Sequence, residues 1–406
     1  MEKQSSLKRK NAVKGIAFGL IFGLAGLFLG YLGGKYLKSN ALFAAIRPDG
    51  VEEKILFAAL SFFAIWLVIA LHEAGHLAAG LAQGFRLALF TAGFLGIRGT
   101  ERGVQFFFNK DINLLGGLAA TFPERLVNGP DLRRKFAWIV AAGPLTSLIV
   151  GIVSLVIGNI FFRQLHSPVS LADRIGLLFL LVTGIFSLLI FLVTSLPLPG
   201  RGFMTDGARF LSLLGSGEKA LREEAGLSVA ALMGAGYLPG EYPSETVNRL
   251  AALPASDLLG LNGHFIALLH YLDRGETERA LPFARSIEAN ISAAPAGPFR
   301  RYYLKEVVFL YGFLLKDADK ARSIWSDIQK GAEKDADAAT FRVKAVLACL
   351  ENKPETALAF VETGLKKLGN HPFLGQRRFE EKWLSAVRAA IAETKQGETL
   401  ADPVYN

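Results

Sequence analysis

The sequence contains a single cysteine, Cys349, which excludes an internal disulfide framework and favours a reducing compartment for the region that holds it. It also lacks a compact motif of basic and aromatic residues, so the formal net charge of +9 does not indicate a nucleic-acid-binding protein. Long apolar runs are absent after Gly207, although 51% of the chain is hydrophobic. The apolar residues are therefore concentrated in the first half, and the excess of basic residues is typical of the cytoplasmic side of a membrane protein.

Four apolar stretches are long enough to cross a hydrocarbon core about 30 Å thick. They comprise residues 15–34, 55 to about 84, about 136 to 162, and 175–196. Basic residues precede the first stretch, and Arg133, Arg134 and Lys135 precede the third. Because such residues favour the cytoplasmic side, we expect a multi-pass protein of a bacterial cell membrane with both termini in the cytoplasm. The first stretch exceeds a usual signal-peptide core, so we expect it to be retained.

Between the second and third stretches, residues 90–98 and 104–108 are short, aromatic and punctuated by glycine. This pattern is typical of strands joined by a turn. Unpaired strands cannot face lipid, so we expect them to pair together, to line a protein cavity, or to lie at the membrane interface. The sequence therefore predicts a small β or re-entrant segment.

The last part of the chain, residues 211–406, contains charged residues throughout and three segments that resemble one another. These segments are residues 268–280, 309–321 and 345–357. Each has an apolar helical stretch, a polar turn, and an alanine that opens a second helix. The alanines, Ala280, Ala321 and Ala357, are 41 and 36 residues apart, near the ~34-residue period of tetratricopeptide repeats. The region is predicted to be a tetratricopeptide-like solenoid that binds a cytoplasmic protein, or else an ordinary helical bundle.

The second apolar stretch ends in the motif His72-Glu73-Ala74-Gly75-His76. On a helix, His72 and His76 lie one turn apart on the same face. Two imidazoles at this spacing can bind one Zn²⁺, with Glu73 beside them to take a proton from water. Hydrogen-bonded core histidines are the alternative, but ionisable groups within a membrane are costly and usually have a function.

A catalytic zinc site usually has three protein ligands and one position for water or substrate. Asp206 is the best candidate for the third ligand, because it follows the fourth apolar stretch, whose end returns to the membrane face of the motif. His166 is expected across the membrane, and the other histidines lie in the region after Gly207. The alternative role for Asp206 is that of a helix N-cap.

These motifs resemble the site-2 protease family of intramembrane zinc metalloproteases. That family has HExxH on one core span, a Gly-Pro pair on the next, and Asn-x-x-Pro followed by Asp-Gly on the third. The corresponding positions here are His72 to His76, Gly143-Pro144, Thr194 to Pro197, and Asp206-Gly207. The resemblance covers about residues 55–210.

The resemblance implies that His72, His76 and Asp206 bind one zinc ion per chain and that Glu73 is the general base. The substrate-positioning residues that it implies are Gly143, Pro144, Ser147 and Thr194. Ser147 and Thr194 stand where the family often has asparagine, so we expect the substrate groove to differ from that of other members.

The fold expected from these observations is mainly α. It consists of a polytopic membrane helix bundle of about four spans, a small β or re-entrant segment, and a C-terminal soluble α-solenoid or helical bundle. The expected domains are residues 1–54 with the first span and an outside loop, residues 55–210 as the metalloprotease core, and residues 211–406 as a cytoplasmic helical domain.

The expected function is hydrolysis of a peptide bond in or near a transmembrane segment of a membrane-bound substrate, in regulated proteolysis. The expected partners are that substrate, the lipid bilayer and a cytoplasmic protein, with no nucleic acid. The alternatives are a catalytically silent membrane scaffold that recruits partners through its helical repeats, and a zinc transporter or sensor in which Glu73 has no role as a base.

Overall fold

In the computed structural model, the described residues are 41–100, 103–110, 115–124, 129–165, 169–197, 204–294, 297–370 and 373–400. The expected first span, residues 15–34, lies outside them. Within the described part the chain is mainly helical, with one small antiparallel sheet. It divides into two compact units. The first contains the described residues up to Leu67 and Val150–Phe186, and the second contains Val68–Ile149 and the described residues from Ser187 onward.

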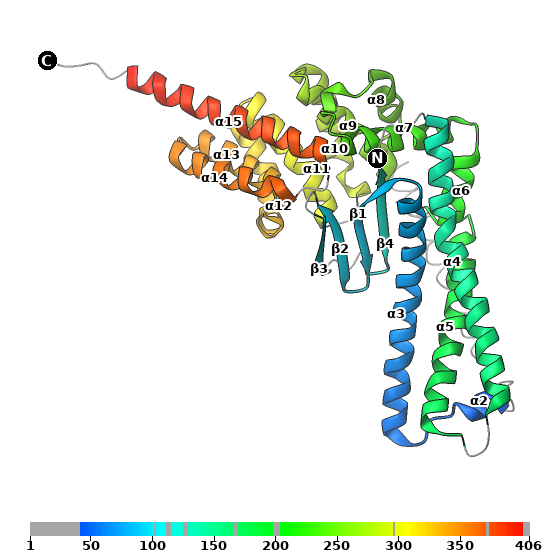
Figure 1. The fold of residues 1–406 in the computed structure, drawn as a ribbon. Coiled ribbons are helices and arrows are strands. Elements are labelled where there is room, and N and C mark those ends of the chain that lie inside the picture. Colours follow the sequence, from blue (N-terminus) through cyan, green and yellow to red (C-terminus); the bar gives the residue numbers. More distant parts are fainter. Residues whose placement is uncertain are drawn as a thin grey trace, which may run out of the picture. The chain divides into compact units, whose positions relative to one another are not determined.

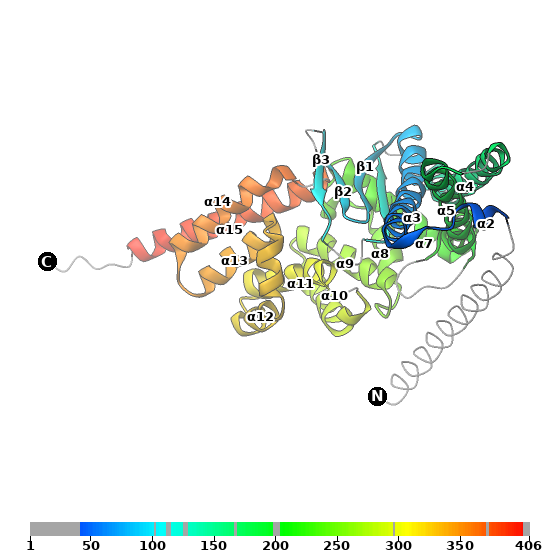
Figure 2. The ribbon, with the colours of Figure 1, turned by 90° about the horizontal axis from the view of Figure 1, so that it is seen from below.

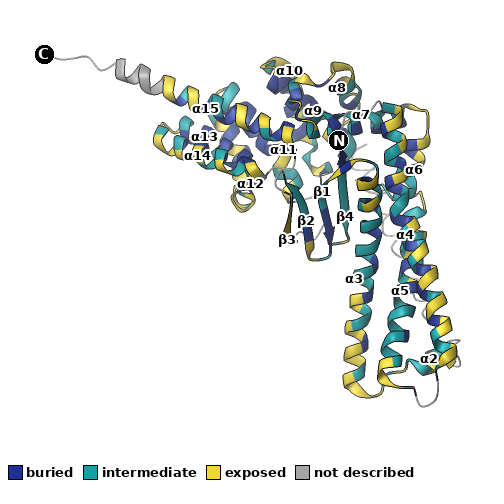
Figure 3. Cartoon of the chain, in the orientation of Figure 1, coloured by how far each residue is buried: buried dark blue, intermediate teal, exposed yellow. Residues whose placement is uncertain are grey.

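Three helices are long and apolar enough to cross a membrane. They are α3 (Gly50–Ala82), α4 (Gly129–Gln164) and α5 (Leu171–Ser195). Figure 3 shows exposed and half-exposed residues along all three helices. Apolar side chains that face outward in this way suit helices that meet lipid. Three of the four expected spans are therefore confirmed as helices of spanning length and composition.

In the first unit, Arg174 ties the beginning of α5 to the beginning of α3. Its guanidinium donates to Asp49 at 3.0 Å and to Glu53 at 2.7 Å, and also to the backbone oxygen of Arg47 at 3.0 Å. Glu53 lies in the first turn of α3, where the helix dipole favours negative charge. A short helix, α2 (Ala41–Ala45), precedes this junction. The two long helices are thus held together by charge at this end.

The second unit contains a four-stranded antiparallel sheet in the order β3-β2-β1-β4 (Figure 1). Its strands are β1 (Phe85–Ala92), β2 (Leu95–Thr100), β3 (Gly103–Phe108) and β4 (Leu118–Pro123). Residues 90–98 do not form one strand, because the chain reverses at Gly93 and pairs Ala92 with Leu95. Gly93 has a φ of +57°, which glycine adopts without strain. The other expected strand, residues 104–108, forms most of β3.

The chain after the membrane helices consists of helices that follow one another in antiparallel pairs (Figures 1 and 2). The leading helices are α6 (Asp206–Leu214), α7 (Glu218–Gly234) and α8 (Ser244–Ala251). The pairs are α9 (Leu258–Asp273) with α10 (Thr277–Asn290), α11 (Pro298–Phe309) with α12 (Ala318–Asp335), and α13 (Ala338–Leu350) with α14 (Pro354–Lys367). The last helix is α15 (Leu374–Leu400).

The three similar segments of the sequence form the turns within these pairs. At the same place in each turn stands a residue with positive φ, namely Gly275 (+72°), Lys316 (+53°) and Asn352 (+55°). The alanines that open the second helices, Ala280, Ala321 and Ala357, are fully buried. The similarity in sequence therefore corresponds to a repeated helix–turn–helix unit. Its assignment as a tetratricopeptide-like solenoid stays a prediction.

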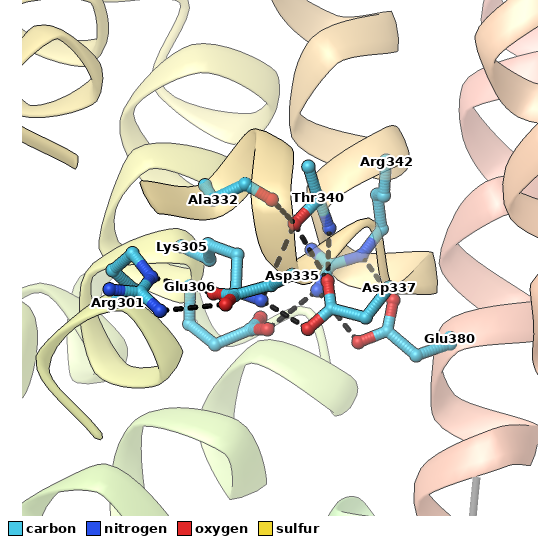
Figure 4. Close-up of polar contacts among 9 residues, drawn as sticks. All are labelled: Arg301, Lys305, Glu306, Ala332, Asp335, Asp337, Thr340, Arg342 and Glu380. Carbon is cyan, nitrogen blue, oxygen red and sulfur yellow. Dashed lines mark hydrogen bonds and ion pairs between the residues drawn. The ribbon is translucent and has the colours of Figure 1, made fainter. Parts of the chain in front are cut away.

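A buried ionic cluster joins α11, α13 and α15 (Figure 4). Arg342 is fully buried and donates to Glu306 at 2.6 Å and to Glu380 at 2.8 Å. Its guanidinium also lies 4.2 Å from the centre of the Phe309 ring. Burial raises the pKa of Glu306 to about 7, although the charge of Arg342 acts in the opposite direction. One arginine thus pairs with two carboxyl groups that come from different helices.

Replacing Arg342 with alanine leaves Glu306 and Glu380 buried without their common partner. We therefore expect the variant to lose about 3–5 kcal/mol of unfolding free energy. The measurement is a urea titration of the full-length protein in detergent, followed by circular dichroism. The control is Arg388→Ala, because Arg388 and its partner Glu362 are half-exposed and 3.6 Å apart, a pair worth at most about 1 kcal/mol. Equal losses in the two variants would contradict this role of the buried cluster.

Candidate metal centre

The motif histidines lie on one face of α3, as the i, i+4 spacing predicts. His72 and His76 are both buried. Their ring centres are 4.9 Å apart, and their Nε2 atoms are separated by 3.3 Å. The two imidazoles therefore direct their Nε2 atoms toward a common point.

Asp206 is the first residue of α6 and approaches both histidines. Its Oδ2 atom lies 3.2 Å from Nε2 of His72 and 3.6 Å from Nε2 of His76. The N-cap of α6 is Thr205, whose hydroxyl oxygen accepts a hydrogen bond from the Ala208 N–H. The alternative reading of Asp206 as the helix cap is therefore wrong.

The charge state of Asp206 suits a ligand. Burial alone raises the pKa of Asp206, but hydrogen bonds and charge from His72 and His76 outweigh it and lower the pKa to about 2. The carboxylate is therefore ionised at neutral pH, as a metal ligand must be.

The three donor atoms form a triangle with sides of 3.2, 3.3 and 3.6 Å. Ligand atoms about 2.0–2.1 Å from a tetrahedral Zn²⁺ are about 3.3–3.4 Å from one another. The triangle therefore has the size that a zinc ion requires. Two imidazoles and one carboxylate are also a donor set of catalytic zinc sites, which keep the fourth position for water.

The other nitrogen of each imidazole has a partner on α4. Nδ1 of His76 donates to the Ile139 carbonyl oxygen at 2.8 Å, and Nδ1 of His72 lies 2.9 Å from the Ser147 hydroxyl. A carbonyl oxygen only accepts, so His76 carries a proton on Nδ1, and its Nε2 atom is the one that faces Asp206 and His72. Partners of this kind fix the orientation of histidine ligands. Ser147, for which the resemblance implies contact with substrate, is here placed against His72.

Glycines allow the helices to approach closely around these donors. A Cβ atom on Gly75 would lie 2.3 Å from the Thr146 hydroxyl oxygen, and one on Gly143 would lie 2.2 Å from Nε2 of His76. At the start of α6, a Cβ on Gly207 would lie 1.8 Å from the Ser195 carbonyl oxygen. Each of these positions therefore excludes a side chain, because backbone or a candidate ligand fills the space.

The remaining residues implied by the resemblance have different surroundings. Pro144 lies within α4 and has no N–H to donate to the carbonyl of Val140, one turn earlier. The Thr194 hydroxyl donates to the Ile190 carbonyl oxygen of its own helix at 2.9 Å. The structure thus brings Gly143 and Ser147 to the histidines, whereas Thr194 bonds within α5. Their roles toward a substrate stay predictions.

One further residue contacts Glu73, and no motif in the sequence singles it out. The Glu73 side chain lies against Gly117, where a Cβ atom would be 2.7 Å from Oε1 of Glu73 and where φ is +99°. From the sequence alone, the pair Gly116-Gly117 signals only a turn.

Comparison with known protein families supplies the remaining evidence. The model described as Peptidase family M50 matches residues 60–381. The chain belongs to peptidase family M50. M50 is the family of the site-2 proteases, so that resemblance is confirmed, and its members are zinc metalloproteases. The match contains all three donor residues and Glu73, and it continues through the helix pairs into the first third of α15. No curated protein and no solved structure gives a match.

M50 membership and the three apolar helices together support a membrane metallopeptidase.

If Ser147 orients a ligand of this metallopeptidase, Ser147→Ala should weaken zinc binding by about 10–100-fold, the usual effect of losing such a partner. Competition with a chromogenic chelator on the purified protein measures the affinity. Ser154→Ala is the control, because Ser154 is also buried on α4 but outside the donor triangle. Unchanged affinity in Ser147→Ala would contradict the orienting role.

Proposed function

We propose that this M50 protein is an intramembrane zinc metalloprotease that hydrolyses a peptide bond in or near a transmembrane segment of a membrane-bound substrate, in regulated proteolysis. The observation that carries the proposal is the triangle of His72, His76 and Asp206, with both histidines and Glu73 on a helix of membrane-spanning length. An ionisable cluster of this kind in an apolar helix indicates function.

The residues of the site divide into ligands and a base. His72, His76 and Asp206 would hold the zinc ion, and three protein ligands leave the fourth position of a tetrahedral site for water or substrate. When bound, the ion polarises the scissile carbonyl and lowers the pKa of water. Glu73 takes a proton from the attacking water and passes it to the leaving amine. Gly117, just before β4, packs against the Glu73 side chain.

The sheet offers a way to hold an extended substrate. A protease must present one backbone segment to its base, and pairing with the edge of a sheet does this through main-chain hydrogen bonds. β4 is an edge strand and lies beside Glu73. At the opposite edge, β3 exposes the apolar side chains of Val104, Phe106 and Phe108. We propose that the sheet receives the unwound part of the substrate near the membrane boundary.

The proposal also includes the orientation of the protein in the membrane. Arg133, Arg134 and Lys135 lie in the first turns of α4, and such clusters favour the cytoplasmic side. Both termini and the helices of residues 211–406 would then be cytoplasmic, in a bacterial cell membrane. The helix pairs would be available to a cytoplasmic protein partner.

Glu73→Gln should retain zinc and lose cleavage by about 10²–10⁴-fold, because the amide cannot accept the proton. The protein is purified in detergent, its zinc is counted by mass spectrometry, and cleavage is followed on a reconstituted membrane substrate. His76→Ala is the companion variant and should lose both zinc and cleavage. Full cleavage by Glu73→Gln would contradict the proposal. A wild type without zinc or cleavage would favour the silent scaffold, and one with zinc but no cleavage would favour a transporter or sensor.

Phe106→Glu should raise KM about tenfold while zinc content stays the same, because a charge replaces an exposed ring on the apolar edge of the sheet. The magnitude is that of losing about 1.4 kcal/mol of binding. Phe106→Leu, which keeps the site apolar, is the matched control and should behave as wild type. If Phe106→Glu shows an unchanged KM, this edge of the sheet does not contact the substrate.

A further inference from the structure

Strand β4 lies along the motif helix from the catalytic base to the end of the helix. Gly117, just before the strand, contacts Glu73. Further along, Thr121 lies against Gly80 of α3, where an added Cβ would be 3.0 Å from the threonine side chain. The chain therefore contacts α3 at two points, and the position of β4 determines how Gly117 packs on Glu73.

The opposite face of β4 carries Phe122. Successive side chains of a strand point to opposite faces, so Phe122 points away from the face that carries Thr121. Its ring is 95% buried, and its centre lies 4.8 Å from that of Phe373. It also lies on Gly234, the last residue of α7, where an added Cβ would be 2.4 Å from the ring. Phe122 is thus enclosed by residues of the C-terminal helical region.

Helix α15, which begins directly after Phe373, is held in place by contacts with other helices. Phe373 directly precedes α15, and Gly375 in its first turn packs on the carbonyl oxygens of Met233 and Tyr237. Further along α15, Glu380 pairs with Arg342, and Lys382 pairs with Asp273 at 2.7 Å. Through α15, the position of β4 is therefore tied to α9 and α13 of the helix pairs.

Helix α7 makes a second connection to the metal centre. Glu223 of α7 is buried and lies 3.5 Å from Arg209 of α6, the helix that begins at Asp206. The guanidinium of Arg209 also lies 4.7 Å from the centre of the Phe136 ring on α4. One end of α7 thus contacts α6, which begins at the candidate ligand Asp206, and the other end contacts β4.

We propose that Phe122 is a positioning residue for Glu73, through which α7 and α15 hold β4 against the motif helix and so place the catalytic base. The proposal rests on the proposed protease function. It gives the C-terminal helices a role in catalysis itself: a change in the packing of α15 moves β4 and the Gly117 backbone that packs on Glu73. Because the contact at Gly117 is with the base, this effect is separable from zinc binding.

The test compares Phe122→Ala, Phe122→Leu and Phe360→Ala in the full-length protein. Displacing a catalytic group by about 1 Å can lower a rate about 100-fold, so Phe122→Ala should lower kcat about 10–100-fold with zinc content unchanged. Phe122→Leu, which restores apolar volume, should recover most of kcat. Phe360→Ala removes a ring from an aromatic pair with Phe341 in the same helical region, away from β4, and should leave kcat near that of wild type.

A double-mutant cycle with Glu73→Asp tests the route of the effect. If Phe122 acts through Glu73, the losses in kcat caused by Phe122→Ala and Glu73→Asp should be far from additive, since each displaces the same carboxylate. Phe122→Ala with wild-type kcat, or with zinc lost in parallel with activity, would overturn the positioning role. Additive losses would also overturn it. Absence of zinc-dependent cleavage in the wild type would instead overturn the protease function, so the two failures are distinguishable.

Discussion

Helices α3, α4 and α6 approach closely around the two buried histidines of the motif. At Gly75, Gly143 and Gly207, one on each helix, there is no space for a side chain. This close approach places the donor atoms of His72, His76 and Asp206 within 3.6 Å of one another. It also brings the orienting partners on α4 within hydrogen-bonding distance of both imidazoles. Any residue larger than glycine at these positions would separate the helices and disperse the donors. The chemistry of the site therefore depends on backbone packing as much as on the ligands.

In the second unit, buried charges are paired both at the metal centre and among the helix pairs. Near the metal centre, the carboxylate of Asp206 faces two imidazoles. In the helix pairs, Arg342 faces Glu306 and Glu380. An isolated charge in either place would be strongly unfavourable, whereas a paired one links the elements that supply the partners. The pairing therefore fixes which helices lie together. Strand β4 lies between the two clusters and contacts α3 on one side and α7 and α15 on the other.

Much of the site could be predicted from the sequence because its residues follow periodic rules. The i, i+4 spacing placed His72 and His76 on one face, and the order of apolar stretches indicated that Asp206 returns to them. The position of Ser147 against His72 could not be predicted, since it depends on how α4 crosses α3. The contact of Gly117 with Glu73 could not be predicted either, because it depends on how the chain around β4 packs along α3.

The fold shows a similar division between local and long-range features. Long apolar runs predicted the membrane helices, and similar segments predicted the helix–turn–helix units with their buried alanines. The sheet was underestimated because β1 and β4 lack a clear alternation of apolar and polar residues. Their burial comes from pairing and from packing on α3 and α7. Nor did the sequence indicate that α15 returns to α7 and β4, since that contact joins Phe122 to Phe373 across about 250 residues of chain.

The most direct test of the metal centre is X-ray absorption at the zinc edge, recorded on the purified full-length protein and on Asp206→Ala. In the wild type, the account predicts one zinc per chain with nitrogen and oxygen neighbours at about 2.0–2.2 Å, two of them imidazoles, and no sulfur. Asp206→Ala should lose the carboxylate oxygen from this shell or lose the metal. A sulfur neighbour, or a spectrum identical in the two proteins, would contradict the assignment of His72, His76 and Asp206 as the zinc ligands.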